Sequence, residues 1–252
     1  CKDRWGLSWQ ITPRVLTEAM AAGGEEAKRA FTAMNWSGEL PFSQDMVNGW
    51  LKQGYDMNLP VLVHANGDAA IDVLLRAHEF AAAESPDKDR RTTVIHSQFV
   101  RPDQLDAYAR LGLAASFFSN HAFYWGDVHL RNLGEERAFF LSPLKTAHDK
   151  GVRYSNHTDY AVTPLDPAMM LWTAVTRQSR SGAVIGAGER VSPQRALEAL
   201  TIDAAWLYRD EDSKGSITVG KQADFVLLDA NPLTVPADRL RGLKVVATIK
   251  DG

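Results

Sequence analysis

Two histidines each end a short apolar stretch, and an aspartate follows a third short segment that is expected to be a strand. The three segments are Val-Leu-Val-His64, Thr-Val-Ile-His96 and Tyr-Ser-Asn-His-Thr-Asp159. Short apolar runs bounded by turns are typical of buried parallel strands. Residues just past the carboxyl ends of neighbouring parallel strands meet at one edge of the sheet. We therefore expect His64, His96 and Asp159 to lie close together.

These three residue types suit metal-assisted hydrolysis. Two neutral imidazoles bind zinc or a similar divalent ion, and a carboxylate beside the ion can take a proton from bound water. A single histidine at a strand end is more often a hydrogen-bonded core residue. Two histidines at equivalent strand ends, with an aspartate at a third, favour a site. A structural domain with core histidines is the alternative.

Other polar residues lie near the same edge. His121 follows the third expected strand and either contacts substrate or has a structural role. His157 lies two residues before Asp159 and either orients it or contacts substrate. Asn66 and Gln98 each lie two residues past a strand-end histidine. We expect them either to hydrogen-bond the metal-binding histidines or to contact substrate. Three further histidines fall on expected helices or inserts, and we expect them to be solvated: His78, His129 and His148.

Composition excludes several functional classes. The chain has 252 residues, 45% of them hydrophobic and 23% charged, which is enough for one large domain with a buried core. A net charge of −3 gives no reason to expect nucleic acid or an anionic membrane as partner. Cys1 is the only cysteine, so a disulfide framework and a thiolate zinc site are excluded within the chain. Neither a phosphate-binding glycine loop nor a G-x-S-x-G nucleophile motif occurs.

The amino-terminal residues give no targeting signal. They lack an initiator Met and the apolar core of a signal peptide. No apolar stretch approaches the roughly 20 residues of a membrane-spanning helix. We expect a soluble fragment or processed chain whose compartment, cytoplasmic or periplasmic and exported, is not indicated by this end.

Strands and helices alternate over the middle of the chain. Strands are expected over 59–64, 92–96, 113–118 and 152–155, and helices over 43–55, 69–83, 102–111, 135–150 and 167–177. An insert over 119–134 separates the third strand from its helix. Ser192 and Pro193 begin another helix as N-cap and first residue. Four strand–helix units form half of an eight-stranded α/β barrel.

The two ends of the chain differ from this middle. Residues 1–42 carry scattered aromatic residues among polar ones and are expected to form an irregular lid or packing segment. Residues 43–209 form the expected partial barrel. From about residue 210 to residue 252 the sequence is rich in turns and strand-like, which predicts a small β unit.

Four motifs together resemble a known family. They are Val63-His-Ala-Asn-Gly-Asp-Ala-Ala-Ile-Asp72, Ile95-His-Ser-Gln98, His157-Thr-Asp159 with Pro164, and Gly215-Ser-Ile-Thr-Val-Gly-Lys-Gln-Ala-Asp-Phe-Val-Leu-Leu-Asp229. In this order and spacing, the chain from about residue 41 to residue 252 resembles the carboxy-terminal part of an amidohydrolase-superfamily enzyme. The similar branch is amidohydrolase family 3 (YtcJ-like).

The resemblance implies a metal-dependent hydrolase on a (β/α)8 TIM-type barrel, with its carboxy-terminal half followed by part of a composite β-sandwich. By position, His64 and His96 match metal ligands after the fifth and sixth strands. Asp159 matches the aspartate after the eighth strand, which binds metal and acts as general base and then general acid. The implied reaction cleaves a C–N bond in an amide, N-acyl amino acid, carbamate or cyclic amide, with one or two divalent ions, most simply zinc.

The chain also departs from the family pattern. The family's first-strand His-x-His pair has no counterpart, because no His-x-His occurs upstream of His64. Its bridging lysine has none either, because Lys2, Lys28 and Lys52 are not in strand contexts. We therefore expect the second half of a protein of about 500 residues or more. Its expected partners are the amino-terminal half of the same protein and a small-molecule substrate, with a homodimer left open. Alone, the chain is expected to bind metal weakly and to have little or no activity.

Rival interpretations share the same barrel. One is a metal-free relative that binds a ligand or acts as a regulator. Isomerase-like or decarboxylase chemistry is another, because a fold does not fix a function. Five aromatic residues near the insert either place an apolar group beside the metal or pack against outer helices: Phe117, Phe118, Phe123, Tyr124 and Trp125.

Overall fold

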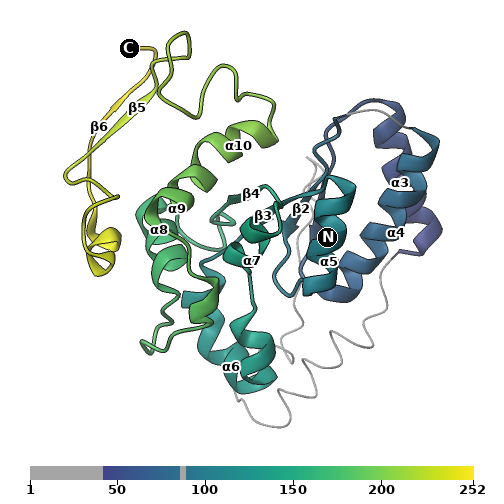
Figure 1. The fold of residues 1–252 in the computed structure, drawn as a ribbon, viewed down its shortest axis with the longest axis horizontal. Helices are drawn as coiled ribbons and strands as arrows, with labels where there is room; N and C mark the ends of the chain where they lie inside the picture. The colour runs from purple at the N-terminus through teal and green to yellow at the C-terminus, as the bar shows by residue number, and fades with distance from the viewer. Residues whose placement is uncertain (1–41, 86–88) are drawn as a thin grey trace.

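A four-stranded parallel sheet forms the centre of the molecule (Figure 1). The computed structural model describes residues 42–85 and 89–252, so the expected lid at 1–42 lies outside the described residues apart from Phe42. The strands follow chain order across the sheet: β1 (Leu62–Ala65), β2 (Thr93–His96), β3 (Ala114–Phe117) and β4 (Tyr154–Asn156). All pairings are parallel, so the four carboxyl ends lie at one edge. The expected strand–helix alternation is confirmed.

Helices flank this sheet. Figure 1 shows α3, α4 and α5 on the side of β2, whereas α8, α9 and α10 lie towards β4. The helices of the described residues are α3 (Gln44–Asp56), α4 (Asp68–Glu84), α5 (Pro102–Leu111), α6 (His121–Phe139), α7 (Leu144–Asp149), α8 (Pro167–Thr176), α9 (Pro193–Leu200) and α10 (Ile202–Leu207), with 3-10 turns η1 (Ala187–Glu189) and η2 (Ala237–Gly242). None of these helices is both long enough and apolar enough to cross a bilayer.

Local sequence signals explain where several helices begin and end. The Ser43 hydroxyl accepts a hydrogen bond from the Met46 amide at the start of α3, and Ser192 does the same at the start of α9. Pro102 begins α5, and Gly112 ends it in the left-handed conformation at φ 68°. These capping residues are why the expected bounds of α5 agree with the structure.

The core lies between the sheet and the helices that cover it. Val94, Leu105 and Ala115 are fully buried and belong to one continuous cluster with side chains of α4, α8 and α9. Burying one such aliphatic side chain contributes about 1.5–3 kcal/mol. The cluster therefore fixes the sheet whose edge carries the site.

The prediction of an insert over 119–134, with the next helix only after it, is wrong, because this segment is mostly helical. Helix α6 begins at His121 and continues to Phe139, with a break at Gly134, where φ is 75° and ψ is 174°. The expected helix at 135–150 is instead the end of α6 followed by the separate helix α7. The buried face of α6 includes His129 and Asn132, so its polar residues mask the apolar periodicity that identifies a helix.

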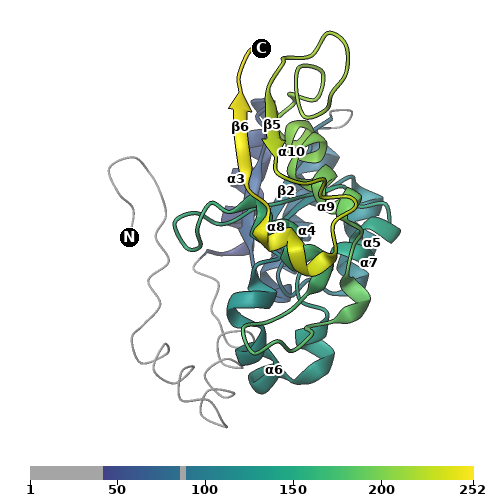
Figure 2. The ribbon, with the colours of Figure 1, turned by 90° about the vertical axis from the view of Figure 1, so that its left-hand side faces the viewer.

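The tail forms a hairpin at the outside of the molecule. Strands β5 (Phe225–Leu228) and β6 (Val245–Ile249) pair antiparallel, with an irregular register between Leu227 and Leu228. Figure 1 shows this hairpin at the left, away from the central sheet, and in Figure 2 the same hairpin faces the viewer. Val226, Val245 and Val246 are exposed on it. The expected small β unit is therefore present as two strands within the described residues.

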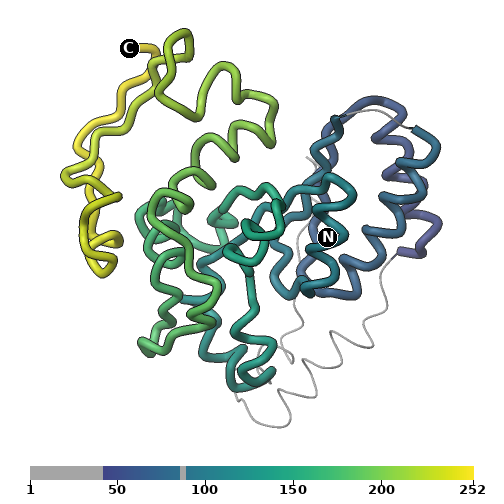
Figure 3. The backbone as a smooth tube through the Cα atoms, viewed as in Figure 1, coloured from purple at the N-terminus to yellow at the C-terminus, as the bar shows by residue number. Residues whose placement is uncertain are grey.

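A fully buried arginine, Arg177, connects three segments of the chain by hydrogen bonds. Arg177 follows α8, and its guanidinium donates to the carbonyls of Ile185 at 2.8 Å, Ser142 at 2.9 Å and Leu141 at 2.6 Å. The tube in Figure 3 shows how the chain returns past α8 near the connection from α6 to α7. Burial lowers the pKa of Arg177 to about 10, and Glu189 opposes that shift. The side chain therefore stays charged at neutral pH.

Gly186 is the glycine whose replacement we expect to disturb this region most. Its φ is 71°, and an added Cβ would lie 1.8 Å from the Phe139 carbonyl oxygen. Gly186→Ala should lower the free energy of unfolding by about 3 kcal/mol, through backbone strain and overlap with main chain. Gly188→Ala is the matched control, because a Cβ there meets nothing within 4 Å. Urea unfolding followed by circular dichroism measures both, and equal midpoints would contradict the prediction.

Candidate active site

The structure brings His64, His96 and Asp159 together at the carboxyl edge of the sheet. His96 ends β2 and pairs in register with Ala65, the residue after His64. The rings of His64 and His96 lie edge to face with centroids 4.7 Å apart. Asp159 follows β4, and its Oδ2 lies 3.9 Å from His96 Nε2. The proximity expected from three strand ends is present.

Two more expected site residues, His121 and His157, join this cluster. His157 Nε2 lies 3.1 Å from His96 Nδ1, and the His121 ring centroid lies 5.8 Å from that of His96. Phe118 stacks on His157 at 5.5 Å and contacts His121 at 4.3 Å between centroids. His157 therefore contacts a histidine rather than pairing with Asp159. The Nδ1 atom of His121 is buried and has no hydrogen-bond partner in the described chain.

Asn66 and Gln98 do not support the two strand-end histidines. Gln98 Nε2 lies 2.9 Å from Nε2 of His129, on α6. The Asn66 carbonyl accepts a hydrogen bond from the Phe99 amide, while its side-chain Oδ1 is buried without a partner among residues 42–85 and 89–252. Their expected role beside the ligands is not seen.

The expectation that His78 and His129 are solvated is wrong. Both side chains are 5% exposed. Nδ1 of His78 bonds the Tyr55 hydroxyl at 2.6 Å, a partner from another helix. His129 packs edge-on against the Phe99 ring at 5.2 Å. His148, by contrast, is exposed as expected.

Burial keeps the histidines of the cluster neutral. It lowers the pKa of His96 to about 3, with further lowering by His157 and His64. Burial also lowers the pKa of His157 to about 4 and that of His64, although Asp159 opposes the shift of His64. The pKa of Asp159 is raised by burial against the opposing effect of His64. Neutral imidazoles with free electron pairs are the form that binds metal.

The backbone at the site takes an uncommon conformation. His96, Ser97 and Asp159 have φ values of 71°, 45° and 51°, in the left-handed region that favours glycine. Such residues persist only where surrounding structure holds them, and they cluster at functional sites. Ser97 is fully buried, with its hydroxyl 3.2 Å from that of Tyr108. This contact helps to hold the turn after β2.

The donor types suit a divalent ion, but the arrangement is incomplete. Two neutral imidazoles and a carboxylate are ligands that zinc accepts. In the part of the chain that the structure describes, however, no three His, Cys, Asp or Glu side chains form a group that could hold a metal ion. The described residues therefore supply part of a ligand set and do not complete it.

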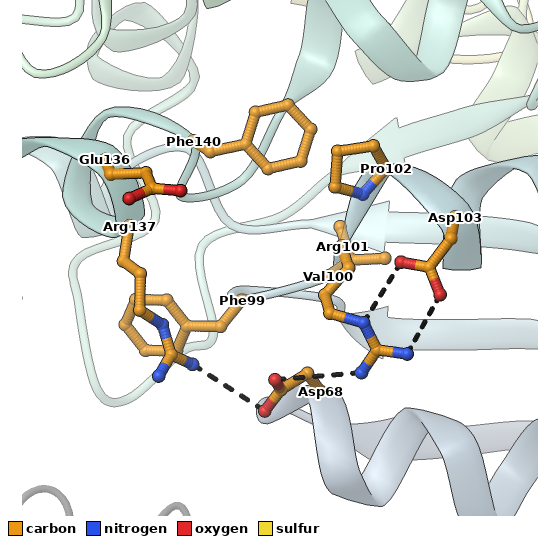
Figure 4. Close-up of a pocket in the computed structure, with 9 residues that line it drawn as sticks. All are labelled: Asp68, Phe99, Val100, Arg101, Pro102, Asp103, Glu136, Arg137 and Phe140. Carbon is orange, nitrogen blue, oxygen red and sulfur yellow. Dashed lines mark hydrogen bonds and ion pairs between the residues drawn. The ribbon is translucent and has the colours of Figure 1, made fainter.

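A pocket of about 520 Å³ opens beside the same edge of the sheet (Figure 4). Its lining comes from the starts of α4 and α5 and the end of α6 and includes no histidine of the cluster. Asp68 lies between two arginines, 3.7 Å from Arg101 and 3.6 Å from Arg137. Arg101 also bonds Asp72 and Asp103. The cations here are already paired with protein carboxylates.

His129 should make stability depend on acid pH. Burial lowers the pKa of His129 to about 4 from its ordinary 6.5. Between these values the unfolded chain binds more protons, so stability falls as pH drops from about 6.5 through 4. The free energy of unfolding should fall less between pH 7 and pH 4 in His129→Gln, by about 3 kcal/mol, than in the unsubstituted chain. Urea unfolding at a series of pH values tests this, with His148→Gln as an exposed control; parallel profiles for His129→Gln and the unsubstituted chain would contradict it.

Sequence reasoning missed two serines that belong to the cluster. Ser116 Oγ lies 2.9 Å from His157 Nδ1, and Ser155 Oγ donates to Ser116 Oγ at 2.9 Å. Both serines lie inside fully buried strands, β3 and β4. A hydroxyl in a strand of that kind needs a polar partner. That requirement is the signal by which they could have been found.

The chain has a parallel α/β sheet with histidines and an aspartate at its carboxyl edge, and a family match agrees with this arrangement. The model of the amidohydrolase family, in its third branch, matches residues 4–252. The chain therefore belongs to this amidohydrolase family, and the resemblance seen in the four motifs is confirmed.

Individual relatives agree with the family match. The chain is 30% identical to the N-substituted formamide deformylase of Arthrobacter pascens, over 84% of this chain and 39% of the relative. It is 26% identical to the putative amidohydrolase YtcJ of Bacillus subtilis, over 80% of this chain and 38% of the relative. A solved structure, an uncharacterized metal-dependent hydrolase from Pyrococcus furiosus, superimposes with a TM-score of 0.66 at 32% identity, covering 79% of this chain and 39% of that one. The chain thus spans about two fifths of these relatives' length.

Proposed function

We propose that this chain is part of a metal-dependent hydrolase that cleaves a C–N bond by activating water. The observation that carries the proposal is the meeting of His64, His96 and Asp159 at one edge of a parallel sheet. In this proposal residues 43–209 are half of a (β/α)8 barrel, and residues 210–252 are part of a β-sandwich.

The relatives support the type of bond. One is an N-substituted formamide deformylase, and others are imidazolonepropionases, 26% identical over 87% of this chain in the Acinetobacter baumannii example. The first name describes an enzyme that acts on an N-substituted formamide. The substrate proposed here is an amide, N-acyl amino acid, carbamate or cyclic amide.

Each residue of the cluster has a proposed task. His64 and His96 hold the ion through neutral imidazole nitrogens, and Asp159 lies beside it. A divalent ion such as zinc, when bound, lowers the pKa of water and polarises a carbonyl. Asp159 accepts a proton at its carboxylate and delivers it to the leaving nitrogen. His121 is proposed to contact substrate, and its buried Nδ1, which lacks a hydrogen-bond partner in the described chain, supports this role.

The remaining metal ligands are proposed to come from residues outside this chain. The described residues do not complete a group that could hold a metal. The chain also covers only 39% of the length of its formamide-deformylase relative. By itself, the chain should therefore bind metal weakly and hydrolyse little. A second copy of the chain is the other conceivable source of ligands, and the mass of the active species distinguishes the two.

Metal content and hydrolysis of the full-length protein test the proposal together. The purified protein should contain a divalent ion by elemental analysis and should hydrolyse a member of a panel of N-substituted formamides, N-acyl amino acids, carbamates and cyclic amides. His64→Ala should lower both the metal content and the rate, whereas exposed His148→Ala should lower neither. A metal-free protein with unchanged ligand binding in His64→Ala would favour the regulatory relative instead.

A further inference from the structure

His96 makes a different contact with each of its ring nitrogens. Nε2 faces Oδ2 of Asp159 at 3.9 Å, while Nδ1 lies 3.1 Å from His157 Nε2. A neutral imidazole carries one proton, so the bond made by Nδ1 decides whether Nε2 has a free electron pair. The tautomer of His96 therefore depends on its contact with His157.

His157 is held so that its Nε2 can point in only one direction. Its Nδ1 bonds Ser116 Oγ at 2.9 Å, and its backbone amide donates to the Phe117 carbonyl at 2.9 Å. The ring lies nearly parallel to that of Phe118, with an angle of 22° between planes. Ser155 donates in turn to Ser116. A ring fixed by bonds and stacking on three sides presents its last nitrogen to His96.

Two arrangements of protons satisfy these contacts. In the first, His96 Nδ1–H donates to His157 Nε2, His157 Nδ1–H donates to Ser116, and the electron pair of His96 Nε2 faces Asp159. In the second, Ser116 donates to His157 Nδ1, His157 Nε2–H donates to His96 Nδ1, and His96 Nε2 carries the proton. The 3.9 Å gap to Asp159 is too long for a hydrogen bond, so the carboxylate does not hold a proton on Nε2.

We propose that His157 is a positioning residue that accepts the Nδ1 proton of His96 and so keeps the electron pair of Nε2 directed into the site. The inference rests on the proposed function only in naming a divalent ion as the species that this electron pair binds. Groups that orient metal-binding histidines in this way fix the tautomer and raise ligand basicity. Here that group is a second histidine, which follows β4, the next strand but one from β2.

The tautomer can be read directly from nitrogen chemical shifts. In the 252-residue chain labelled with ¹⁵N-histidine, long-range ¹H–¹⁵N correlation should find the proton of His96 on Nδ1. His157→Phe keeps an aromatic ring against Phe118 but removes the acceptor, so the proton should move to Nε2. His157→Gln returns an acceptor oxygen and should restore the Nδ1 proton. A proton on Nε2 in the unsubstituted chain, or one tautomer in all three proteins, would overturn the inference.

Binding of zinc alone to the full-length protein, measured by calorimetry, supplies a second measurement, because the 252-residue chain by itself should bind metal weakly. His157→Phe should weaken the zinc affinity by about 10–100-fold, and His157→Gln should recover most of that loss. Exposed His148→Phe is the matched control for folding and for nonspecific zinc binding. If His64→Ala abolishes zinc binding while His157→Phe changes neither tautomer nor affinity, the proposed function stands and this inference fails. If His157 sets the tautomer but the full-length protein binds no zinc, the inference stands and the proposed function fails.

Discussion

Asp159→Asn should lower kcat of the full-length protein for hydrolysis, the proposed activity, by about 10²–10⁴-fold. The amide has nearly the same size as the carboxylate but cannot accept a proton from water or return one to the leaving nitrogen. KM should change much less, because the substitution removes an interaction made in the transition state rather than in substrate binding. Steady-state kinetics on the best substrate of the amide panel measures both constants.

The controls separate chemistry from metal loss and from folding. Asp149→Asn alters an exposed carboxylate paired with Lys145 on α7 and should leave kcat unchanged. Elemental analysis of Asp159→Asn shows whether the ion is retained, since Asp159 is also a proposed ligand. A variant that retained its metal and lost less than about 10-fold in kcat would remove Asp159 from the role of proton carrier.

Replacing Arg177 should have the largest effect on stability. Arg177→Met removes the guanidinium that serves the carbonyls of Ile185, Ser142 and Leu141. Each buried acceptor left without a donor costs about 1–3 kcal/mol, while removing a buried cation returns part of this loss. We expect the free energy of unfolding to fall by about 3–5 kcal/mol.

Two comparison variants make this prediction specific. Arg177→Lys keeps the charge but cannot reach three diverging carbonyls from one ammonium group, so its loss should be nearly as large. Arg110→Met removes an exposed arginine paired with Glu79 and should change stability by less than about 1 kcal/mol. Urea midpoints for the three variants provide the test. Equal stability of Arg177→Met and Arg110→Met would show that the buried bonds contribute no net stabilisation.

The meeting of His64, His96 and Asp159 was predictable because parallel topology alone determines it. An apolar run followed by a polar residue marks a strand end, and neighbouring strand ends share an edge of the sheet. The bounds of α5 were predictable for a similarly local reason, its proline start and glycine end. Signals of this kind act over a few residues and need no knowledge of packing.

The rest of the site depends on contacts between distant segments. His78 is buried because Tyr55, on another helix, bonds its ring. The partner of His157 is His96 rather than the neighbouring Asp159, whose φ of 51° turns the chain after β4. Residues on α6 such as His129 are buried although polar, which conceals the helix from any reading of periodicity. Tertiary structure decides these features.

The left-handed backbone at His96, Ser97 and Asp159 has a consequence for protein engineering. Glycine relieves this conformation at any of the three positions, so a screen that rewards heat resistance alone would favour replacing them. At His96 and Asp159 such a change removes a side chain of the proposed chemistry, and at Ser97 it removes the hydroxyl beside Tyr108. Laboratory evolution of this family member should therefore select for turnover and thermal tolerance together, or hold these three codons fixed.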